Sequence, residues 1–187
     1  MGRRLLRWAV GWVALASVVP GVGMAADQAP IVFEGTCDAS GAVFTLDGAL
    51  LVADERTDEL HTYAVTGGAP LSSIDLYGLT GTPRNARRNY SAFEGAARLG
   101  DRVYFVTSHA REAKGKNRPN RRRLLAVESR RTGEAEQFEP IGVAYTNLAV
   151  DLASRPEVRS LGLAGSIMHL HRQLPHLSPD QRGLNIE

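Results

Sequence analysis

Acidic and basic side chains fall into two separate blocks of this 187-residue sequence. Residues 27–83 carry nine acids and a single base, Arg56, whereas residues 84–131 carry fourteen bases and four acids. A dense block of bases attracts anions, but it can also be neutralised by the acidic half of the same molecule. The sequence therefore allows two interpretations, an anion-binding surface and a solvated loop with an internal counter-charge.

The candidates for anion binding lie at the ends of expected strands and in a basic loop. Residues 111–123 carry seven bases around a glycine and a proline, a composition that favours a long hairpin loop over a helix. Arginine suits phosphate and carboxylate because its planar fork donates two parallel hydrogen bonds. No aromatic residues alternate with these bases, which argues against nucleic acid. We expect an anionic small molecule or polysaccharide to be bound by Arg56, His109, Arg111, Lys114, Lys116, Arg118 and Arg121.

Three carboxylates are candidates for a calcium-type site. Phe33-Glu34-Gly35 recurs as Phe93-Glu94-Gly95, sixty residues later, and Asp54 ends an expected strand. If Glu34 and Glu94 occupy equivalent positions of two repeats, they converge with Asp54, and carboxylate oxygens are the ligands that Ca²⁺ prefers. The alternative is that the glutamates cap backbone amides. The three histidines at 169, 171 and 176 are expected on the surface, because no acid or cysteine stands at zinc-ligand spacing.

Residues 1–25 have the composition of a signal peptide. Arg3, Arg4 and Arg7 precede an uncharged run over 8–19, and small residues follow at 23–25. A retained anchor is the alternative, but the run falls short of the roughly 20 apolar residues that span a bilayer. We expect a periplasmic or secreted protein without a stable membrane span, exported by the general or the twin-arginine route. Removing three of the 22 bases leaves 19 against 20 acids, a net charge of −1.

The single cysteine, Cys37, excludes an internal disulfide, and we expect it to be a small buried residue. Nucleophilic elbow, phosphate-binding glycine loop and zinc-protease helix motifs do not occur in the sequence.

Short runs of β-branched and aromatic residues predict a mainly β fold. Residues 50–55, 59–65 and 71–76 read as strands, and residues 104–109, 123–128 and 136–145 repeat the order, with tight turns at Asp47-Gly48 and Gly100-Asp101. We expect two four-stranded propeller blades at about 31–80 and 91–145. A helical insertion over about 146–180 contains a helix at 147–153 and a second helix behind a capping box at 154–157.

A family resemblance rests on several of these motifs in order. The motifs are Phe33-Glu34-Gly35-Thr36-Cys37-Asp38-Ala39-Ser40, residues 94–101, Ser108-His109 followed by Arg118-Pro119-Asn120-Arg121, and Gly183-Leu184-Asn185-Ile186-Glu187. Together they resemble the domain of unknown function 3616 family. The resemblance implies an exported bacterial protein with a β-propeller fold, distantly similar to phytase-like esterase-type propellers, and it brings no settled activity.

The family's pattern continues beyond the Leu-Asn-Ile-Glu motif, at which this sequence stops. A closed propeller needs about four blades or more. We therefore expect residues 26–187 to form an incomplete propeller, with two blades and the start of a third, that self-associates through open sheet edges. The expected function is a ligand-binding or scaffold module for an anionic partner. The alternatives are a calcium-type, metal-assisted phosphoesterase-like hydrolase and a truncated non-functional remnant; we lean against an enzyme.

Overall fold

The computed structural model describes residues 29–82, 90–133, 135–164 and 183–186. The chain divides into two compact units, residues 1–30 and 31–187, and the described strands and helices all belong to the second. The signal peptide expected over 1–25, the three distal histidines and Glu187 lie outside the described residues. Among the residues that are described, no helix has the length and apolar character needed to cross a bilayer.

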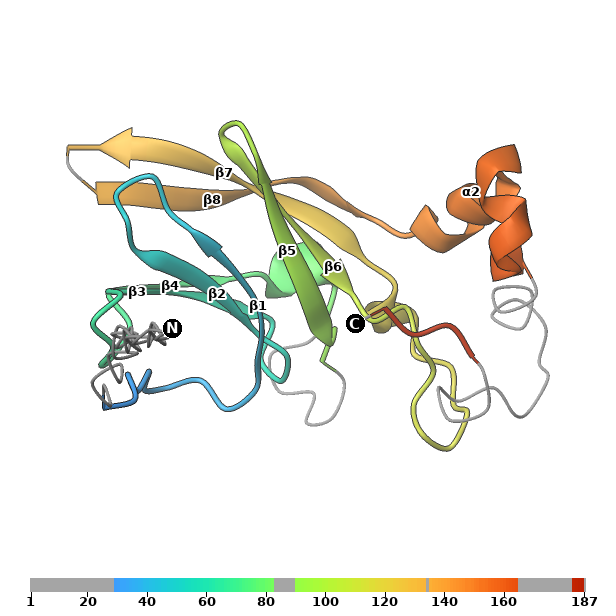
Figure 1. The fold of residues 1–187 in the computed structure, drawn as a ribbon, viewed down its shortest axis with the longest axis horizontal. Coiled ribbons are helices and arrows are strands. Elements are labelled where there is room, and N and C mark those ends of the chain that lie inside the picture. Colours follow the sequence, from blue (N-terminus) through green and yellow to red (C-terminus); the bar gives the residue numbers. More distant parts are fainter. Residues whose placement is uncertain (1–28, 83–89, 134, 165–182, 187) are drawn as a thin grey trace, which may run out of the picture. The chain divides into compact units, whose positions relative to one another are not determined.

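The fold is mainly β, as the sequence predicts, and consists of two four-stranded antiparallel sheets (Figure 1). Each sheet is a simple meander in which neighbours in sequence are neighbours in space. The first sheet contains β1 (Ala39–Phe44), β2 (Leu50–Asp54), β3 (Glu59–Tyr63) and β4 (Ser72–Asp75). The second contains β5 (Phe93–Leu99), β6 (Arg102–Thr107), β7 (Leu124–Thr132) and β8 (Ala135–Tyr145). In the described part of the chain neither sheet closes on itself.

Both predicted hairpin turns are confirmed. Gly48 adopts φ +85° and its amide donates to the Thr45 carbonyl, while the Thr45 hydroxyl accepts from the Ala49 amide (2.7 Å). Gly100 likewise adopts a positive φ between β5 and β6. Glycine reaches these backbone angles without the steric cost that a side chain brings, so each turn is tight enough to pair its strands directly.

The two sheets share a register, and it differs from the one expected. In each sheet the first strand has a register irregularity, between Ala39 and Gly41 in β1 and between Phe93 and Gly95 in β5. Gly41 therefore corresponds to Gly95, a spacing of 95 − 41 = 54 residues. The sixty-residue echo of Phe-Glu-Gly was wrong as a guide to equivalent positions, because the first copy precedes β1 and the second lies inside β5.

The sheets pack face to face over one hydrophobic core. Leu51, Ala53 and Leu60 of the first sheet contact the inner face of the second, and all three are fully buried. β1 and β5 lie close together at the corresponding glycines: a Cβ on Gly41 would lie 3.1 Å from the Gly95 carbonyl carbon. A side chain at position 41 would therefore push the two strands apart.

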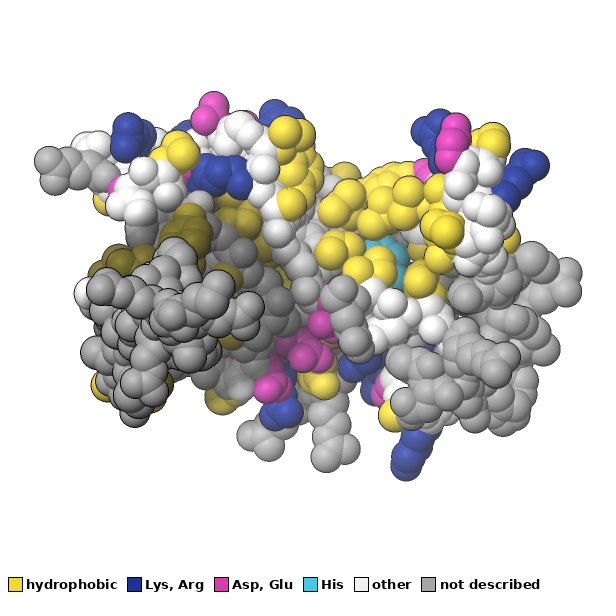
Figure 2. All heavy atoms as spheres, viewed as in Figure 1, with side chains coloured by type: hydrophobic (Ala, Val, Ile, Leu, Met, Phe, Trp, Pro, Cys, Tyr) yellow, Lys and Arg dark blue, Asp and Glu magenta, His cyan; other side chains and the backbone are white. Residues whose placement is uncertain are grey.

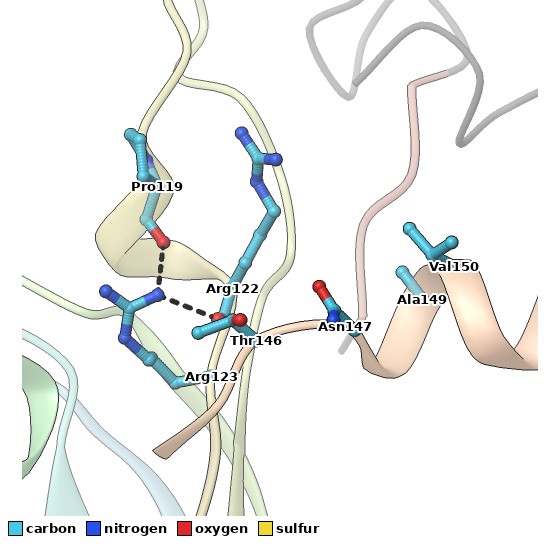
Figure 3. Close-up of a pocket in the computed structure, with 7 residues that line it drawn as sticks. All are labelled: Pro119, Arg122, Arg123, Thr146, Asn147, Ala149 and Val150. Atoms are coloured by element: carbon cyan, nitrogen blue, oxygen red, sulfur yellow. Dashed lines mark hydrogen bonds between the residues drawn. The ribbon is translucent and has the colours of Figure 1, made fainter. Parts of the chain in front are cut away.

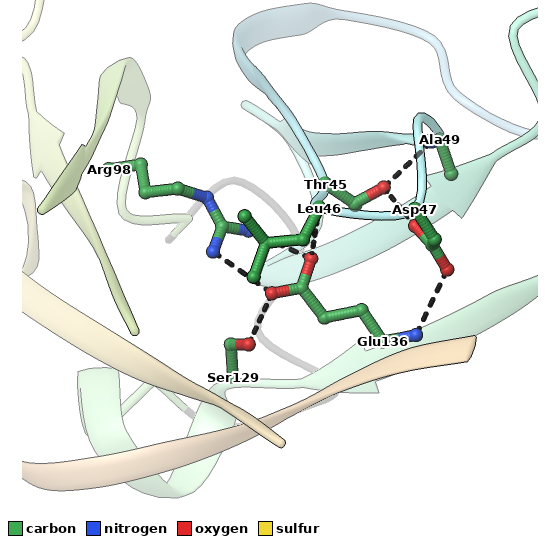
Figure 4. Close-up of polar contacts among 7 residues, drawn as sticks. All are labelled: Thr45, Leu46, Asp47, Ala49, Arg98, Ser129 and Glu136. Atoms are coloured by element: carbon green, nitrogen blue, oxygen red, sulfur yellow. Dashed lines mark hydrogen bonds and ion pairs between the residues drawn. The ribbon is translucent and has the colours of Figure 1, made fainter. Parts of the chain in front are cut away.

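A buried ion pair within the second sheet also holds the turn of the first hairpin (Figure 4). Arg98 donates to both carboxylate oxygens of Glu136 (2.9 and 3.0 Å), and the Leu46 amide donates to the same carboxylate (2.6 Å). The Glu136 amide in turn donates to Asp47 (3.0 Å). The Glu136 carboxylate of β8 thus accepts from a β5 side chain and from a backbone amide of the β1–β2 turn. The bond from the Leu46 amide, together with the bond from the Glu136 amide to Asp47, fixes the first hairpin against the second sheet.

Asp58 fixes the connection between the sheets. Its carboxylate accepts from the Thr80 hydroxyl (2.7 Å) and from the Ser91 amide (2.8 Å), and its side chain is fully buried. Thr80 ends the short helix α1 (Tyr77–Thr80), and Ser91 stands just before β5. The Asp58 carboxylate therefore holds both ends of the connection, the point where the chain leaves the first sheet and the point where it enters the second.

Two short helical segments follow β8. The helix predicted at 147–153 is confirmed as α2 (Leu148–Ser154). The predicted capping box was wrong: Pro156–Leu161 forms a 3₁₀ helix, η2, whose N-cap is Arg155, and the Ser154 hydroxyl donates back to the Asp151 carbonyl (2.7 Å). Hydroxyls in a last helical turn readily bond backward in this way, which removes the cap from the next segment.

Candidate anion-binding site

Four of the seven cationic residues expected to bind an anion line one cavity. It has a volume of about 890 Å³ and is bordered by Arg56, Tyr90, Glu112, Ala113, Lys114, Arg118 and Arg121. Arg56 comes from the β2–β3 turn of the first sheet, and residues 112–121 come from the β6–β7 loop of the second. The cavity therefore combines the single base of the acidic half with the basic loop, 56 residues or more apart in sequence.

The turn that carries Arg56 is built on Asp54. The carboxylate of Asp54 accepts from the Thr36 hydroxyl (2.7 Å), the Cys37 amide (2.9 Å) and the Arg56 amide (2.8 Å). Burial alone would raise the pKa of Asp54, but these hydrogen bonds outweigh it and hold the pKa below its ordinary value. The Arg56 guanidinium forms an ion pair with Asp38 and is largely exposed.

The buried side chain of Arg111 holds the β6–β7 loop in its conformation. Arg111 is buried and its Nη1 donates to the Gly115 carbonyl (3.0 Å), while the Gly115 amide donates to the Glu112 carbonyl (2.7 Å). Gly115 has φ +75°, a conformation that glycine adopts freely. This tight turn places Glu112 within reach of Arg118, whose Nε donates to the Glu112 carboxylate (2.9 Å). The hydrogen bond from Arg118 holds the pKa of Glu112 below its ordinary value.

The far side of the cavity is held by one 3₁₀ turn, η1 (Pro119–Arg121). Asn120 is buried and its side-chain amide donates to the Tyr90 carbonyl. The Arg121 guanidinium lies over the Tyr90 ring, 5.4 Å from its centroid. Such a cation–π contact orients the guanidinium while leaving its hydrogen-bond donors available to a ligand.

Lys114 is the least engaged base at this cavity. It is exposed, and among the residues that the structure describes it has no hydrogen bond or ion pair. The lining thus holds four bases and one acid, Glu112, which is paired with Arg118. A surplus of positive charge over a concave surface attracts oxyanions such as phosphate, sulfate and carboxylate.

The other expected ligand residues lie elsewhere. His109 is fully buried with φ +53°, and its Nδ1 donates to the Thr107 carbonyl (2.8 Å). Burial lowers the pKa of His109, and the charges of Arg122 and Arg123 lower it further, against a smaller opposing effect of the Thr107 carbonyl. His109 is therefore neutral at pH 7 and belongs to the support of the loop. Lys116 is exposed but is not among the residues that line the cavity.

The three carboxylates expected at a metal site have different surroundings. The oxygens of Asp54 accept hydrogen bonds, Glu34 is exposed ahead of β1, and Glu94 stands at the irregular position of β5. In the described ranges no group of three or more histidine, cysteine, aspartate or glutamate side chains could hold a metal ion. The calcium site stays a sequence-based prediction without geometric support.

Cys37 is exposed, so the expectation of a buried cysteine was wrong. Its backbone amide is held by Asp54 in the segment before β1, which runs along the surface and turns the side chain outward.

A second, smaller cavity of about 290 Å³ lies between η1 and the start of α2 (Figure 3). Figure 3 shows the Arg123 guanidinium directed at the carbonyls of Pro119 (2.7 Å) and Arg122 (2.9 Å). Arg122 is hydrogen-bonded to Asn117, and burial lowers its pKa. These two arginines are already committed to holding the loop, so we favour the larger cavity as the anion site.

Sequence reasoning missed Tyr90 and Glu112. Tyr90 follows an arginine-rich stretch and Glu112 stands inside the basic loop, so both could have been noticed as interruptions of the charge pattern. Their pairing with Arg121 and Arg118 depends on how the loop folds, which composition does not reveal.

Comparison with protein-family models, with curated proteins and with solved structures finds no match. The family resemblance based on the sequence motifs therefore stays a prediction.

Proposed function

We propose that this chain is an exported binding module that holds an oxyanion-bearing ligand in the cavity of Arg56, Lys114, Arg118 and Arg121. One observation carries the proposal: bases from two different sheets face one concave surface of about 890 Å³. The export part of the proposal is supported by the composition of residues 1–25.

The four bases offer two kinds of recognition. The planar fork of Arg121 is oriented by Tyr90, and an oriented fork loses little freedom when it binds an oxyanion. Arg118 already donates from Nε and Nη2 to Glu112, so the rest of its guanidinium is the part that faces a ligand. Lys114 and Arg56 extend into solvent and add charge to the rim. This combination suits a ligand with several phosphate, sulfate or carboxylate groups better than one with a single charge.

The geometry favours binding over phosphoester hydrolysis. Asp54 is the metal candidate in the same turn as Arg56, and it already accepts three hydrogen bonds from its own loop. A carboxylate in that state has little capacity left for a cation.

Isothermal titration of the purified protein with two probes, inorganic phosphate and polygalacturonate, tests the proposal and separates phosphate from uronate as the ligand chemistry. We expect binding that weakens as salt rises, and at least about tenfold weaker binding for the double variant Lys114→Gln/Arg121→Gln. The matched control is Arg131→Gln, an exposed base at the end of β7 outside the cavity. Equal binding by the double variant and the wild type would show that the anion is held elsewhere.

We further propose that the two sheets are propeller blades. Three features support this proposal: the two sheets have the same strand order, each has a register irregularity in its first strand, and they pack face to face.

A further inference from the structure

The second sheet has an apolar face that points away from the core. We call it the outer face and define it by the residues on that side of β5 to β8: Leu99, Tyr104, Leu124, Ala126, Ile141, Val143 and Tyr145. Val143 is 88% exposed and Leu99 73%. Figure 2 shows hydrophobic side chains gathered over the region where Figure 1 draws β6, β7 and β8. Soluble proteins rarely leave a continuous apolar face of this kind open.

The register shows what kind of surface fits this face. When the two sheets are aligned by their strand pairing, three residues of the first sheet correspond to three of the second. Leu51 corresponds to Tyr104, Ala53 to Val106 and Leu60 to Leu124. In the first sheet these positions are fully buried against another sheet. The outer face of the second sheet is therefore the same kind of packing surface, and the partner that suits it is the apolar face of a sheet.

The side of the first sheet that faces away from the second sheet is already covered, so it cannot receive such a partner. Val52, His61 and Tyr63 on that side are at most 8% exposed. Phe33 packs edge-on against the Tyr63 ring at 5.3 Å, and the Tyr63 hydroxyl donates to the Glu34 carbonyl (2.8 Å). Head-to-tail stacking of two copies on this side would have to displace the segment that holds Phe33.

We propose that a second copy of this chain covers the outer face with its own outer face, in a two-fold dimer. Two-fold symmetry requires a surface that complements itself. Here opposite charges stand together at the edge of the face, where Arg102 pairs with Glu128 (3.4 Å) and Arg130 with Glu139 (3.2 Å). An antiparallel arrangement brings the arginines of one copy to the glutamates of the other. The whole chain carries a net charge of only +2, so repulsion between copies is small.

Sedimentation velocity of the purified protein over a concentration series tests the dimer. We expect a concentration-dependent dimer, and for Val143→Lys a dissociation constant raised by at least about tenfold. Val143 is exposed, so this substitution should leave the fold intact, which circular dichroism and the unfolding midpoint verify. The matched control is Leu71→Lys, at an exposed leucine (66%) on the first sheet's β3–β4 connection, which should dimerise as the wild type does.

Several results overturn the proposal. A wild-type protein that stays monomeric into the sub-millimolar range rules out the second copy as the partner. A Val143→Lys variant that dimerises normally, or a Leu71→Lys variant that is equally impaired, moves the contact away from the outer face. Phosphate binding at the cavity is a separate measurement, so either proposal can fail without the other.

Discussion

Glu136 has partners in its own sheet and one in the hairpin of the first sheet. Its carboxylate accepts from Arg98, Ser129 and the Leu46 amide, and the carboxylate is inaccessible to solvent. Removing it leaves the Arg98 guanidinium, itself only 17% exposed, without its counter-charge. The contact between the first hairpin and the second sheet therefore depends on this residue.

Glu136→Ala should lower the free energy of unfolding by about 3 kcal/mol, because it breaks a buried, bidentate ion pair from one side. Urea unfolding monitored by circular dichroism measures the loss. The control is Glu139→Ala on the same strand: Glu139 pairs with Arg130 but is 56% exposed, and its removal should change stability by less than about 1 kcal/mol. Equal losses for the two variants would mean that the buried Arg98–Glu136 pair contributes no more to stability than the exposed Arg130–Glu139 pair.

Acid should destabilise the protein through the same residue. Burial alone would raise the pKa of Glu136, but the hydrogen bonds from Ser129, the Leu46 amide and Arg98 outweigh it and lower the pKa. The unfolded glutamate takes up a proton first, at about pH 4.3, so the stability from this group is complete above that pH and is lost as pH falls through the lower folded pKa. Urea unfolding at a series of pH values should show a shallower acid slope for Glu136→Gln than for the wild type.

His109 should make stability depend on pH in a higher range. Its pKa is lowered in the folded protein mainly by burial, so the unfolded chain binds the proton first. Stability from this group is therefore complete above about pH 6.5 and declines as pH falls below that value. His109→Asn keeps a residue that tolerates the positive φ, and it should reduce the slope of stability against pH between about 6.5 and 5. An unchanged slope would show that His109 titrates normally.

At the scale of elements, the approach of β1 to β5 rests on glycine. Gly41→Ala places a methyl group 3.1 Å from the Gly95 carbonyl carbon and 3.2 Å from the Ala96 nitrogen, and backbone atoms cannot move aside as a side chain can. We expect a loss of about 1 to 3 kcal/mol. Gly78→Ala is the matched control, because nothing lies within 4 Å of its added Cβ and it stands in α1; it should be neutral or stabilise by up to about 1 kcal/mol.

The elements themselves were largely predictable, whereas their equivalence was not. Asp47-Gly48 and Gly100-Asp101 carry local turn chemistry, so the hairpins and the alternating runs beside them could be assigned from sequence. The Phe-Glu-Gly echo misled because a three-residue match contains no information about strand register, which the pairing of Gly41 and Gly95 with β2 and β6 decides. The basic loop was found by its composition, but Tyr90 and the Arg98–Glu136 pair join residues far apart in the chain.

For the whole molecule, the separation of charge along the sequence becomes a separation in space. The acidic half forms the first sheet, and the basic loop extends from the second, yet Arg56 is placed at the same cavity as Lys114, Arg118 and Arg121. Part of the basic charge is compensated within the molecule: Glu112 pairs with Arg118, and Asp38 pairs with Arg56. Lys114 and Arg121 lack such a carboxylate among their described contacts, and they account for the charge that we expect a ligand to neutralise.

An NMR titration of the isotope-labelled protein with inorganic phosphate tests the anion site most directly, because it locates binding residue by residue. We expect the largest amide shifts at residues 112–121, with smaller ones at Arg56 and Tyr90, and we expect them to shrink as salt rises. Shifts confined to Arg122, Asn147 and their neighbours at the smaller cavity, or an absence of saturable shifts with both phosphate and polygalacturonate, would contradict the proposed site.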